Sequence, residues 1–363
     1  METRSVRTVL IAAGGTGGHL FPGIAVADEL VRRDTGTRVV FAGTARGLES
    51  RLVPRAGYAL ELLPILPLNG VGLRRMLSGL AVLPWGLVKS ALLVLRLGPS
   101  AVLGIGGYAG GPVTLLAALL GVRAVILEPN ARPGFTNRIL GPFVDIAACA
   151  YDEARASFGA KGVLTGNPVR GGFAALPARQ PREPLTLLAF GGSQGSRALN
   201  RALVAALPSL PGPERLRIVH QTGPALRDEV AAAYRAVKRP DEVVAFVDDM
   251  PRRFGEADLV LSRSGATTCA ELCAAGKAAI LLPFAGAADD HQTTNARTLE
   301  ASGAARVLDE RQLSGEGLAR AIGDLIGAPQ ALAAMGAAAR RLGRPDAAAR
   351  VADLLLGPGA AGA

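Results

Sequence analysis

Cysteine, histidine and aromatic residues are scarce in this chain. Its 363 residues include three cysteines, three histidines and one tryptophan, and aromatic residues make up only 4% of the total. The spacings of Cys149, Cys269 and Cys273 match neither a disulfide framework nor a zinc site, so we expect a reducing compartment and no bound metal. So few aromatic residues leave little from which to build stacking platforms, and we therefore expect no nucleic-acid partner.

Charged residues are also sparse, and the basic ones are almost all arginine. They make up 19% of the chain against 49% hydrophobic residues, and the net charge is +10 with only four lysines. This apolar content excludes intrinsic disorder, and the length predicts about two domains of ordinary size. The positive charge predicts an anionic partner, for which a membrane surface and a phosphorylated metabolite remain open.

Short apolar runs recur along the chain, each followed by Gly or Pro and then by helical spacing. This alternation predicts an α/β protein with parallel sheets covered by helices on both faces. The first series of predicted strands covers residues 8–12, 39–41, 59–63, 102–105, 124–127 and 146–149. The second series covers residues 185–190, 217–221, 243–246, 259–261 and 278–282. We interpret the two series as a duplicated nucleotide-binding unit.

A Gly- and Pro-rich stretch, residues 166–184, separates the two series and is the best linker candidate. It divides the chain into a predicted first domain, residues 1–165, and a second domain, residues 185–340. Residues 331–356 are rich in Ala, Leu and Arg and predict helix without a strand.

The longest apolar stretch, residues 76–97, is interrupted by Pro84, Lys89 and Arg96. These interruptions favour a helix at a membrane interface over one that spans the bilayer. The alternative is a crossover helix buried on the sheet, which fits residues 87–95 better than residues 74–85. The predicted membrane patch consists of Arg74, Arg75, Met76, Leu77, Leu80, Leu83 and Trp85.

Each series of strands opens with a glycine-rich turn between a buried strand and a helix. Residues 14–19 read Gly-Gly-Thr-Gly-Gly-His, and residues 191–196 read Gly-Gly-Ser-Gln-Gly-Ser. Such turns let backbone N–H groups approach a phosphate, and two of them suit a diphosphate substrate. The first turn lacks the spacing and the acidic partner of a dinucleotide fingerprint, and neither is followed by a P-loop lysine. A nicotinamide dehydrogenase and a P-loop ATPase are therefore disfavoured.

Further candidate residues follow predicted strands at the edge where such sheets bind ligands. His19 lies beside the first glycine turn, so a catalytic or phosphate-contacting role competes with a structural one. Glu128 ends a strand and is either a general base or a structural cap. Glu271 either complements a helix dipole or accepts hydrogen bonds from sugar hydroxyls. We expect His220, at the end of another strand, to be structural.

Taken together, these motifs closely resemble the MurG family over nearly the whole chain. The resemblance lies in residues 14–23, 106–108, 128–130, 166–170, 191–195 and 263–266, in Glu271, and in residues 290–292. Members of this family transfer N-acetylglucosamine from UDP-GlcNAc to lipid I and so make lipid II for peptidoglycan synthesis, cell shape and cell division. The resemblance implies a GT-B fold of two Rossmann-like domains facing a cleft. It also implies that a C-terminal helix, residues 341–363, packs back toward the first domain.

The resemblance also implies roles for individual residues. Val247 would meet the uracil through its backbone, Glu271 would hold the ribose, and the diphosphate would lie on Ser193 and the helix start at Ala266, Thr267 and Thr268. Arg170, Asn130 and Gln292 would contact phosphate or sugar hydroxyls. The turn with Thr16, Gly17, Gly18 and His19 would face the acceptor diphosphate. Tyr108 and Arg263 belong to the matching motifs.

The implied reaction is a single inverting displacement at the anomeric carbon without a cofactor. Many relatives have a histidine at the position of Leu127, and its loss here leaves His19 and Glu128 as the candidates for the base. The lipid acceptor implies a peripheral protein on the cytoplasmic face of the cell membrane, with its anionic lipids as a partner. Two rival readings remain, a UDP-GlcNAc 2-epimerase of the same architecture and a non-catalytic UDP-sugar-binding subunit.

Overall fold

The computed structural model describes residues 7–14, 17–45, 47–66, 73–287 and 290–357, with only the backbone for residues 73–78 and 80. The chain forms two compact units. Unit 1 comprises residues 1–170 and 344–363, and unit 2 comprises residues 171–343. The chain therefore passes between the units twice, first after Arg170 and again after Gly343.

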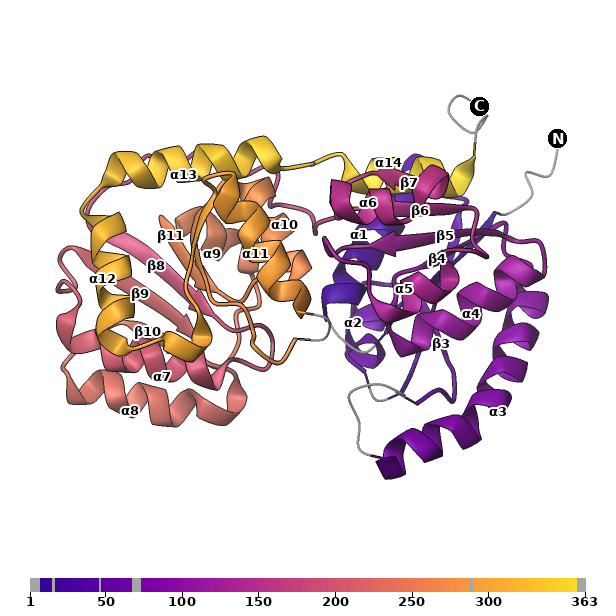
Figure 1. Ribbon diagram of the computed structural model, residues 1–363, viewed down its shortest axis with the longest axis horizontal. Coiled ribbons are helices and arrows are strands. Elements are labelled where there is room, and N and C mark those ends of the chain that lie inside the picture. Colours follow the sequence, from indigo (N-terminus) through magenta and orange to yellow (C-terminus); the bar gives the residue numbers. More distant parts are fainter. Residues whose placement is uncertain (1–6, 15–16, 46, 67–72, 288–289, 358–363) are drawn as a thin grey trace. The chain divides into compact units, whose positions relative to one another are not determined.

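Unit 1 is built on a parallel sheet of seven strands in the order β3-β2-β1-β4-β5-β6-β7 (Figure 1). Its strands are β1 (Thr8–Ala12), β2 (Arg38–Gly43), β3 (Ala59–Leu62), β4 (Ala101–Gly104), β5 (Arg123–Glu128), β6 (Ile146–Cys149) and β7 (Gly162–Leu164). Its helices are α1 (Gly17–Arg33), α2 (Glu49–Arg55), α3 (Leu73–Leu97), α4 (Gly107–Leu119), α5 (Phe135–Leu140), α6 (Asp152–Ser157) and α14 (Ala347–Leu356).

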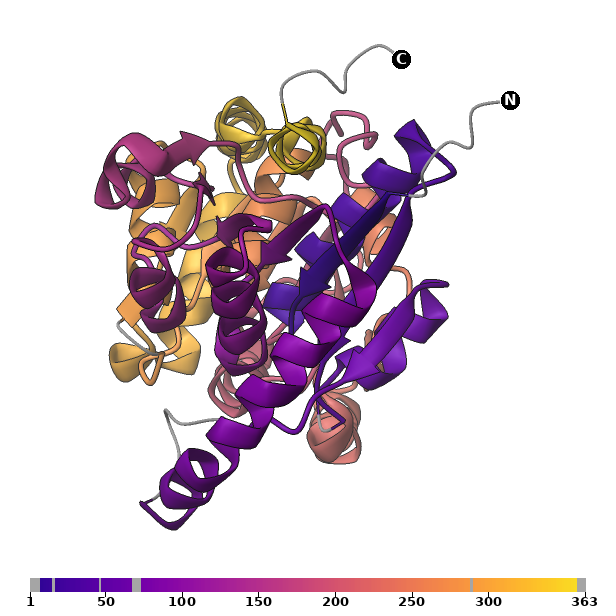
Figure 2. The same cartoon turned by 90° about the vertical axis from the view of Figure 1, so that its right-hand side faces the viewer.

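Both faces of this sheet are covered, which explains why its strands are continuous apolar runs. Val9 and Ile11 of β1 pack with α1, α2 and α14 in one core cluster. Leu10 and Ala12, which point to the other face, pack with α3 and α4. The helix α3 is the long purple helix in the foreground of Figure 2.

The last helix that the structure describes, α14, belongs to unit 1. Val351 and Leu355 are buried in the core cluster that contains α1. Arg33 of α1 forms an ion pair with Asp353, and Arg123 Nε donates a 2.7 Å hydrogen bond to the Leu354 carbonyl. Apolar burial and polar contacts therefore both attach α14 to this unit.

Unit 2 repeats the plan with a parallel sheet of six strands in the order β10-β9-β8-β11-β12-β13. Its strands are β8 (Leu185–Phe190), β9 (Leu216–Gln221), β10 (Glu242–Val244), β11 (Leu259–Ser262), β12 (Ala278–Leu281) and β13 (Ala305–Val307). Its helices are α7 (Arg197–Ala206), α8 (Arg227–Ala236), α9 (Met250–Glu256), α10 (Ala266–Ala275), α11 (His291–Ala301), α12 (Gly315–Ile326) and α13 (Pro329–Leu342).

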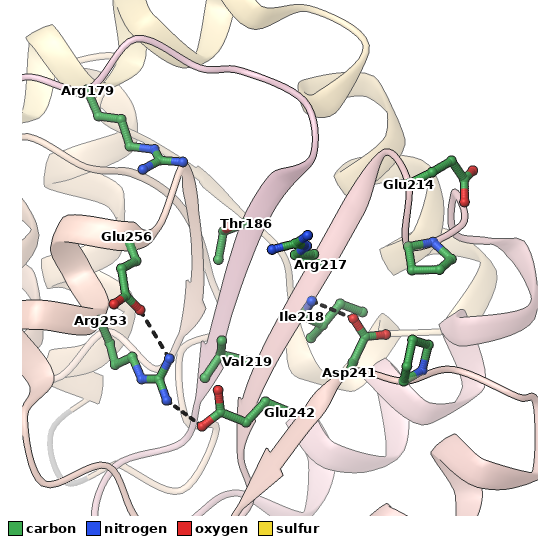
Figure 3. A pocket seen from close by; sticks show the side chains of 12 residues that line it. Arg179, Thr186, Glu214, Arg217, Ile218, Val219, Asp241, Glu242, Arg253 and Glu256 are labelled. Atoms are coloured by element: carbon green, nitrogen blue, oxygen red, sulfur yellow. Dashed lines mark hydrogen bonds and ion pairs between the residues drawn. The ribbon is translucent and has the colours of Figure 1, made fainter.

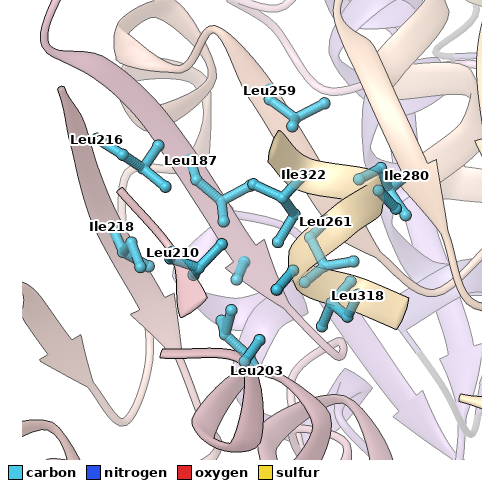
Figure 4. Close-up of a cluster of buried hydrophobic side chains, with 14 of the residues drawn as sticks. Leu187, Leu203, Leu210, Leu216, Ile218, Leu259, Leu261, Ile280, Leu318 and Ile322 are labelled. Carbon is cyan, nitrogen blue, oxygen red and sulfur yellow. The ribbon is translucent and has the colours of Figure 1, made fainter. Parts of the chain in front are cut away.

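The main core of unit 2 lies between this sheet and the helices α7, α8 and α12. Leu187 and Leu261 of the central strands meet Leu203 of α7 and Ile322 of α12 there (Figure 4). Alternate residues of the strands supply this core, as expected for a sheet with one face against these helices.

The predicted α/β architecture with two parallel sheets is confirmed, and every predicted strand forms within a few residues of its expected bounds. Two strands were missed, β7 and β13, which have three residues each and lie at sheet edges. The helix expected over residues 331–356 is two helices, α13 and α14, because Gly343 is in an extended conformation and Pro345 follows it.

Candidate active site

The strand order of each sheet reverses beside the strand that precedes its glycine-rich turn. In unit 1 the chain turns back between β1 and β4, and in unit 2 between β8 and β11. Open parallel sheets bind their ligands at the carboxyl edge of such reversal points. The glycine-rich turns after β1 and β8 follow the strands at these reversal points, each within its own unit. Thr16 lies outside the described residues.

In unit 1, His19 lies against the glycine turn that follows β4. A Cβ atom built on Gly107 would stand 3.6 Å from His19 Nδ1 and 3.0 Å from the Gly14 carbonyl oxygen. Gly107 also has a φ of 70°, so both its conformation and its surroundings require glycine. Gly17 and Gly18 open α1 beside His19, at the helix end that attracts an anion.

A buried carboxylate lies beneath this first turn. Glu49 is 1% exposed and accepts hydrogen bonds from Thr44 N at 2.8 Å and Thr44 Oγ1 at 2.9 Å. The Thr44 hydroxyl is in turn 3.3 Å from the Tyr108 hydroxyl, and a Cβ atom on Gly14 would meet Glu49 Oε1 at 2.8 Å. The sequence reading missed Glu49, whose only signal is an acidic residue in the first turn of α2.

The carboxylate of Glu128 holds the loop that follows β5. Its Oε1 accepts bonds from Asn130 N at 3.0 Å and Asn130 Nδ2 at 3.1 Å, and its Oε2 accepts from Gly134 N at 3.0 Å and Asn137 Nδ2 at 2.9 Å. Burial raises the pKa of the Glu128 carboxyl, while these four bonds oppose the rise. With 1% of the residue exposed and both oxygens engaged, the geometry favours the cap over the base.

Arg170, the last residue of unit 1 before the chain passes to unit 2, stacks on α1. Its guanidinium carbon lies 4.1 Å from the centre of the Phe21 ring. This cation–π contact fixes the positive charge one helical turn from the residues that open α1. Arg170 and the first glycine turn therefore lie on the same part of unit 1.

In unit 2, the glycine turn after β8 and the start of α10 provide two sets of backbone N–H groups. Gly195 N donates to the Gly192 carbonyl at 2.9 Å, which closes a tight turn around Ser193. Gly265 is the N-cap of α10, so Ala266, Thr267 and Thr268 form the first turn. Both are arrangements that suit phosphate oxygens. Glu271 lies in the following turn of α10 and is 3% exposed.

Arg263 and Gln292 fasten the loop that follows β12. Arg263 forms a 2.6 Å ion pair with Glu310, whose pKa this contact holds below its usual value, and donates to the Leu282 carbonyl at 3.2 Å. Gln292 Oε1 accepts a 3.0 Å bond from Phe284 N, and its carbonyl accepts one from Ser264 Oγ at 2.8 Å. Both predicted binding residues thus have contacts that hold the loop itself.

The backbone N–H of Val247 is occupied by a side chain that the sequence reading missed. Gln221, the last residue of β9, is 1% exposed and accepts this bond at Oε1 over 2.9 Å. Its Nε2 donates to the Gly192 carbonyl, also over 2.9 Å. A polar residue at the carboxyl end of a strand is the signal that the sequence offers for Gln221, and its neighbour His220 offers the same one.

His220 is fully buried, as its expected structural role requires. Its Nδ1 lies 3.2 Å from the Tyr234 hydroxyl and its Nε2 3.1 Å from Asn200 Oδ1. Because Asn200 Nδ2 donates to the Thr222 carbonyl, its Oδ1 faces the histidine as an acceptor, so Nε2 carries the proton. Burial lowers the pKa of His220 to about 4.

A groove of about 680 Å³ in unit 2 contains none of the predicted site residues. It lies along β8, β9 and β10 near their amino ends, where Thr186, Arg217 and Val219 line it (Figure 3). Arg253 bridges Glu242 and Glu256 at one side. Because parallel strands offer their functional loops at the opposite edge, we place no substrate here.

The predicted membrane patch lies on α3, and of its seven side chains the structure describes only Leu83 and Trp85. Trp85 is 54% exposed, and an exposed stripe continues along the helix through Val88, Leu92 and Leu95. The alternative of a helix buried on the sheet therefore applies only to the opposite face of residues 87–95, where Leu93 and Val94 are buried. Among the helices that the structure describes, none has the length and apolar character needed to cross a bilayer.

Comparisons with known proteins match both units. The N-terminal domain model of glycosyltransferase family 28 matches residues 9–149, and its C-terminal domain model matches residues 186–351. A UDP-N-acetylglucosamine–N-acetylmuramyl-(pentapeptide) pyrophosphoryl-undecaprenol N-acetylglucosamine transferase of Myxococcus xanthus (strain DK1622) is 46% identical over 95% of this chain and 91% of its own.

Solved structures agree with the sequence relatives. The crystal structure of Acinetobacter baumannii MurG has a TM-score of 0.78 and 32% identity, and the match covers 96% of this chain and 99% of that one. A putative UDP-N-acetylglucosamine 2-epimerase from Listeria monocytogenes has a TM-score of 0.68 over 96% of this chain and 95% of its own, but at 15% identity it shows the fold alone. The chain therefore belongs to glycosyltransferase family 28 and, within it, to the MurG family.

Proposed function

We propose that this enzyme transfers N-acetylglucosamine from UDP-GlcNAc to the C4 hydroxyl of the muramoyl unit of lipid I, giving lipid II and UDP. The observation that carries this proposal is the 46% identity to the Myxococcus xanthus transferase over nearly the full length of both chains. The retention of glycine-rich turns at the carboxyl edges of both sheets supports it further.

The reaction is a single displacement. The C4 hydroxyl oxygen forms a bond to the anomeric carbon, the bond from that carbon to the UDP oxygen breaks, and the hydroxyl proton passes to a base. His19 is the better candidate for this base, because Glu128 is 1% exposed and already accepts four hydrogen bonds. General-base assistance typically contributes about 10²–10⁴-fold to the rate.

The departing UDP gains negative charge, which fixed donors would stabilise. We assign this role to the turn that holds Ser193, to the first turn of α10 with Ala266, Thr267 and Thr268, and to Arg170. Glu271 would hold the ribose, Val247 the uracil, and Asn130 and Gln292 the sugar hydroxyls. The N–H groups of the two turns and the Arg170 guanidinium would supply the electrophilic assistance from the chain itself.

The acceptor carries a polyprenyl chain, so the enzyme must reach a membrane surface. We assign this contact to α3, where Trp85, Val88, Leu92 and Leu95 are about half or more exposed and recur at helical spacing. Lys89 lies 4.8 Å above the Trp85 ring and adds positive charge beside the stripe. The net charge of +10 suits the anionic lipids of a cytoplasmic membrane face.

One assay tests the proposal against its rivals. Radiolabelled UDP-GlcNAc is incubated with the enzyme, with and without a lipid I analogue, and the products are separated. We expect label in the lipid fraction only when the acceptor is present. Epimerised UDP-sugar without acceptor would instead indicate the 2-epimerase, and unchanged donor in both incubations would indicate a binding subunit.

A further inference from the structure

The side chain of Gln221, at the end of β9, joins two loops. One loop follows β8 and the other follows β10. In the sheet β9 lies between β8 and β10. The amide of Gln221 donates to Gly192, in the turn after β8, and accepts from Val247, three residues after β10, each over 2.9 Å. One buried amide therefore uses both of its ends, and each end reaches a different loop.

The acceptor on the first loop is itself held in place. The Gly192 carbonyl accepts a second bond, from Gly195 N at 2.9 Å. A Cβ atom on Gly195 would stand 1.9 Å from the Thr222 carbonyl oxygen, so the turn lies directly on the backbone that follows Gln221. The position of the turn is thus set relative to the end of β9, with little freedom to shift.

The second loop is tied at its far side as well. Val247 is 7% exposed. Asp249, which follows it by two residues, caps α9 by accepting the Arg252 N–H at 3.1 Å. Between these anchors the Val247 N–H finds its partner on Gln221. Loss of Gln221 would leave this buried N–H and the Gly192 carbonyl with fewer partners, and the two loops would no longer share a side chain.

We propose that Gln221 is a positioning residue that fixes the distance between two loops of the donor site. These are the diphosphate loop, which is the turn with Gly192, and the uracil loop, which is the segment with Val247. This inference rests on the proposed function, which assigns the two ends of UDP to these two loops. A ligand that uses both loops gains from their fixed spacing, because the second contact becomes intramolecular once the first has formed. A ligand that uses one loop gains nothing from it.

The test compares UDP, which needs both loops, with uridine, which needs only the uracil loop. Dissociation constants are measured by calorimetry for UDP and by ligand-observed NMR for uridine. Gln221→Met keeps the length of the side chain and removes both hydrogen bonds. We expect UDP to bind about tenfold more weakly and uridine to change by less than about threefold. In the transfer assay, KM for UDP-GlcNAc should rise while kcat stays near the parent value.

Two further variants keep the test decisive. Gln221→Asn retains a buried amide that is too short to reach both loops, so it should show the same selective loss if Gln221→Met does not fold. Tyr234→Phe serves as the control, because it removes a hydroxyl whose neighbour is His220 Nδ1, at 3.2 Å, behind the same strand. It should leave both dissociation constants unchanged.

The outcomes distinguish failure of the positioning role of Gln221 from failure of the proposed transferase function. Equal weakening of UDP and uridine, or no weakening of either, would overturn the positioning role while leaving the transferase proposal intact. If the parent enzyme itself binds no UDP, the proposed function fails and the inference fails with it.

Discussion

Asn137 Nδ2 lies 2.9 Å from Oε2 of Glu128 and the same distance from the Leu127 carbonyl oxygen. The amide of one helix residue therefore fixes both the end of β5 and the carboxylate that completes it. This arrangement makes Glu128 part of the loop, and it leads to distinct expectations for the two base candidates.

Replacing Glu128 should affect the loop more than the chemistry. Glu128→Gln turns one acceptor oxygen into an NH₂ group that faces the donors of Asn130 or Gly134, and we expect a loss of about 1–3 kcal/mol in the free energy of unfolding. Urea denaturation followed by Trp fluorescence measures it, because the only tryptophan, Trp85, lies in unit 1. An unchanged midpoint would contradict the structural role.

Replacing His19 should affect the chemistry more than the fold. His19→Ala should lower kcat for transfer by about 10²–10⁴-fold while the affinity for UDP-GlcNAc and the urea midpoint stay close to the parent values. Turnover near the parent rate in His19→Ala would refute its assignment as the base. If Glu128→Gln then shows the larger loss of kcat at unchanged donor affinity, the base is Glu128.

His220 should make unit 2 sensitive to mild acid. The pKa of His220 is lowered to about 4 in the folded protein from an ordinary value of 6.5, so between these values the unfolded chain binds more protons. Its contribution is therefore complete above pH 6.5 and falls as the pH falls, by about 1.4 kcal/mol at pH 5.5.

The measurement uses urea denaturation followed by far-UV circular dichroism at pH 7.5 and pH 5.5. His220→Gln retains a donor and an acceptor for Asn200 and Tyr234 but does not titrate, so it should lose less stability on acidification than the parent. The other histidines, His19 and His291, are present in both proteins, so the comparison isolates His220. An identical loss in the two proteins would mean that His220 does not govern the acid response.

Two glycines in one turn allow the effect of a steric clash to be separated from the effect of backbone strain. Gly192 and Gly195 have φ values of 87° and 75°. A Cβ atom on Gly192 would meet nothing within 4 Å, whereas on Gly195 it would collide with the Thr222 carbonyl. We expect Gly192→Ala to cost about 1 kcal/mol of strain and Gly195→Ala more than about 2 kcal/mol. Equal urea midpoints for the two variants would refute this difference.

The exposed stripe of α3 should bind lipid vesicles. Leu92 and Leu95 are 53% and 64% exposed, so Leu92→Glu/Leu95→Glu should leave the fold intact. Because full burial of a leucine is worth about 1.5–3 kcal/mol, we expect vesicle affinity to fall by about tenfold or more. Sedimentation with anionic vesicles measures it.

The control for this prediction is Val237→Glu, an exposed apolar position of unit 2 that is 39% exposed. It should bind vesicles like the parent. Arg74→Glu/Arg75→Glu should weaken binding to anionic vesicles at low salt, and equal binding of the parent to neutral vesicles would contradict the electrostatic part.

Much of the fold could be predicted because buried parallel strands are uninterrupted apolar runs bounded by Gly and Pro. The strands β7 and β13 escaped because three residues at a sheet edge carry too little pattern. The part of the exposed α3 stripe beyond Trp85 also escaped, since Leu92 and Leu93 are chemically alike and only packing on the sheet separates them.

The candidate site could be located from its glycine turns but not resolved into roles. Glu128 looked equally suitable as base or cap until its donors from residues 130, 134 and 137 were known. Gln221 and Glu49 gave only weak signals, because their importance arises from segments that meet in space and lie far apart in the sequence. The spacing of glycines in the sequence reveals a turn, whereas contacts between turns become visible only in the three-dimensional structure.

The place of α14 has a consequence for how the protein is made. Unit 2 is an insertion within unit 1, since residues 171–343 interrupt a unit whose core includes Val351, Ala352 and Leu355. On a translating ribosome, unit 2 can complete its core while unit 1, although begun first, still lacks its final helix. We therefore expect the first-synthesised unit to be the last to mature.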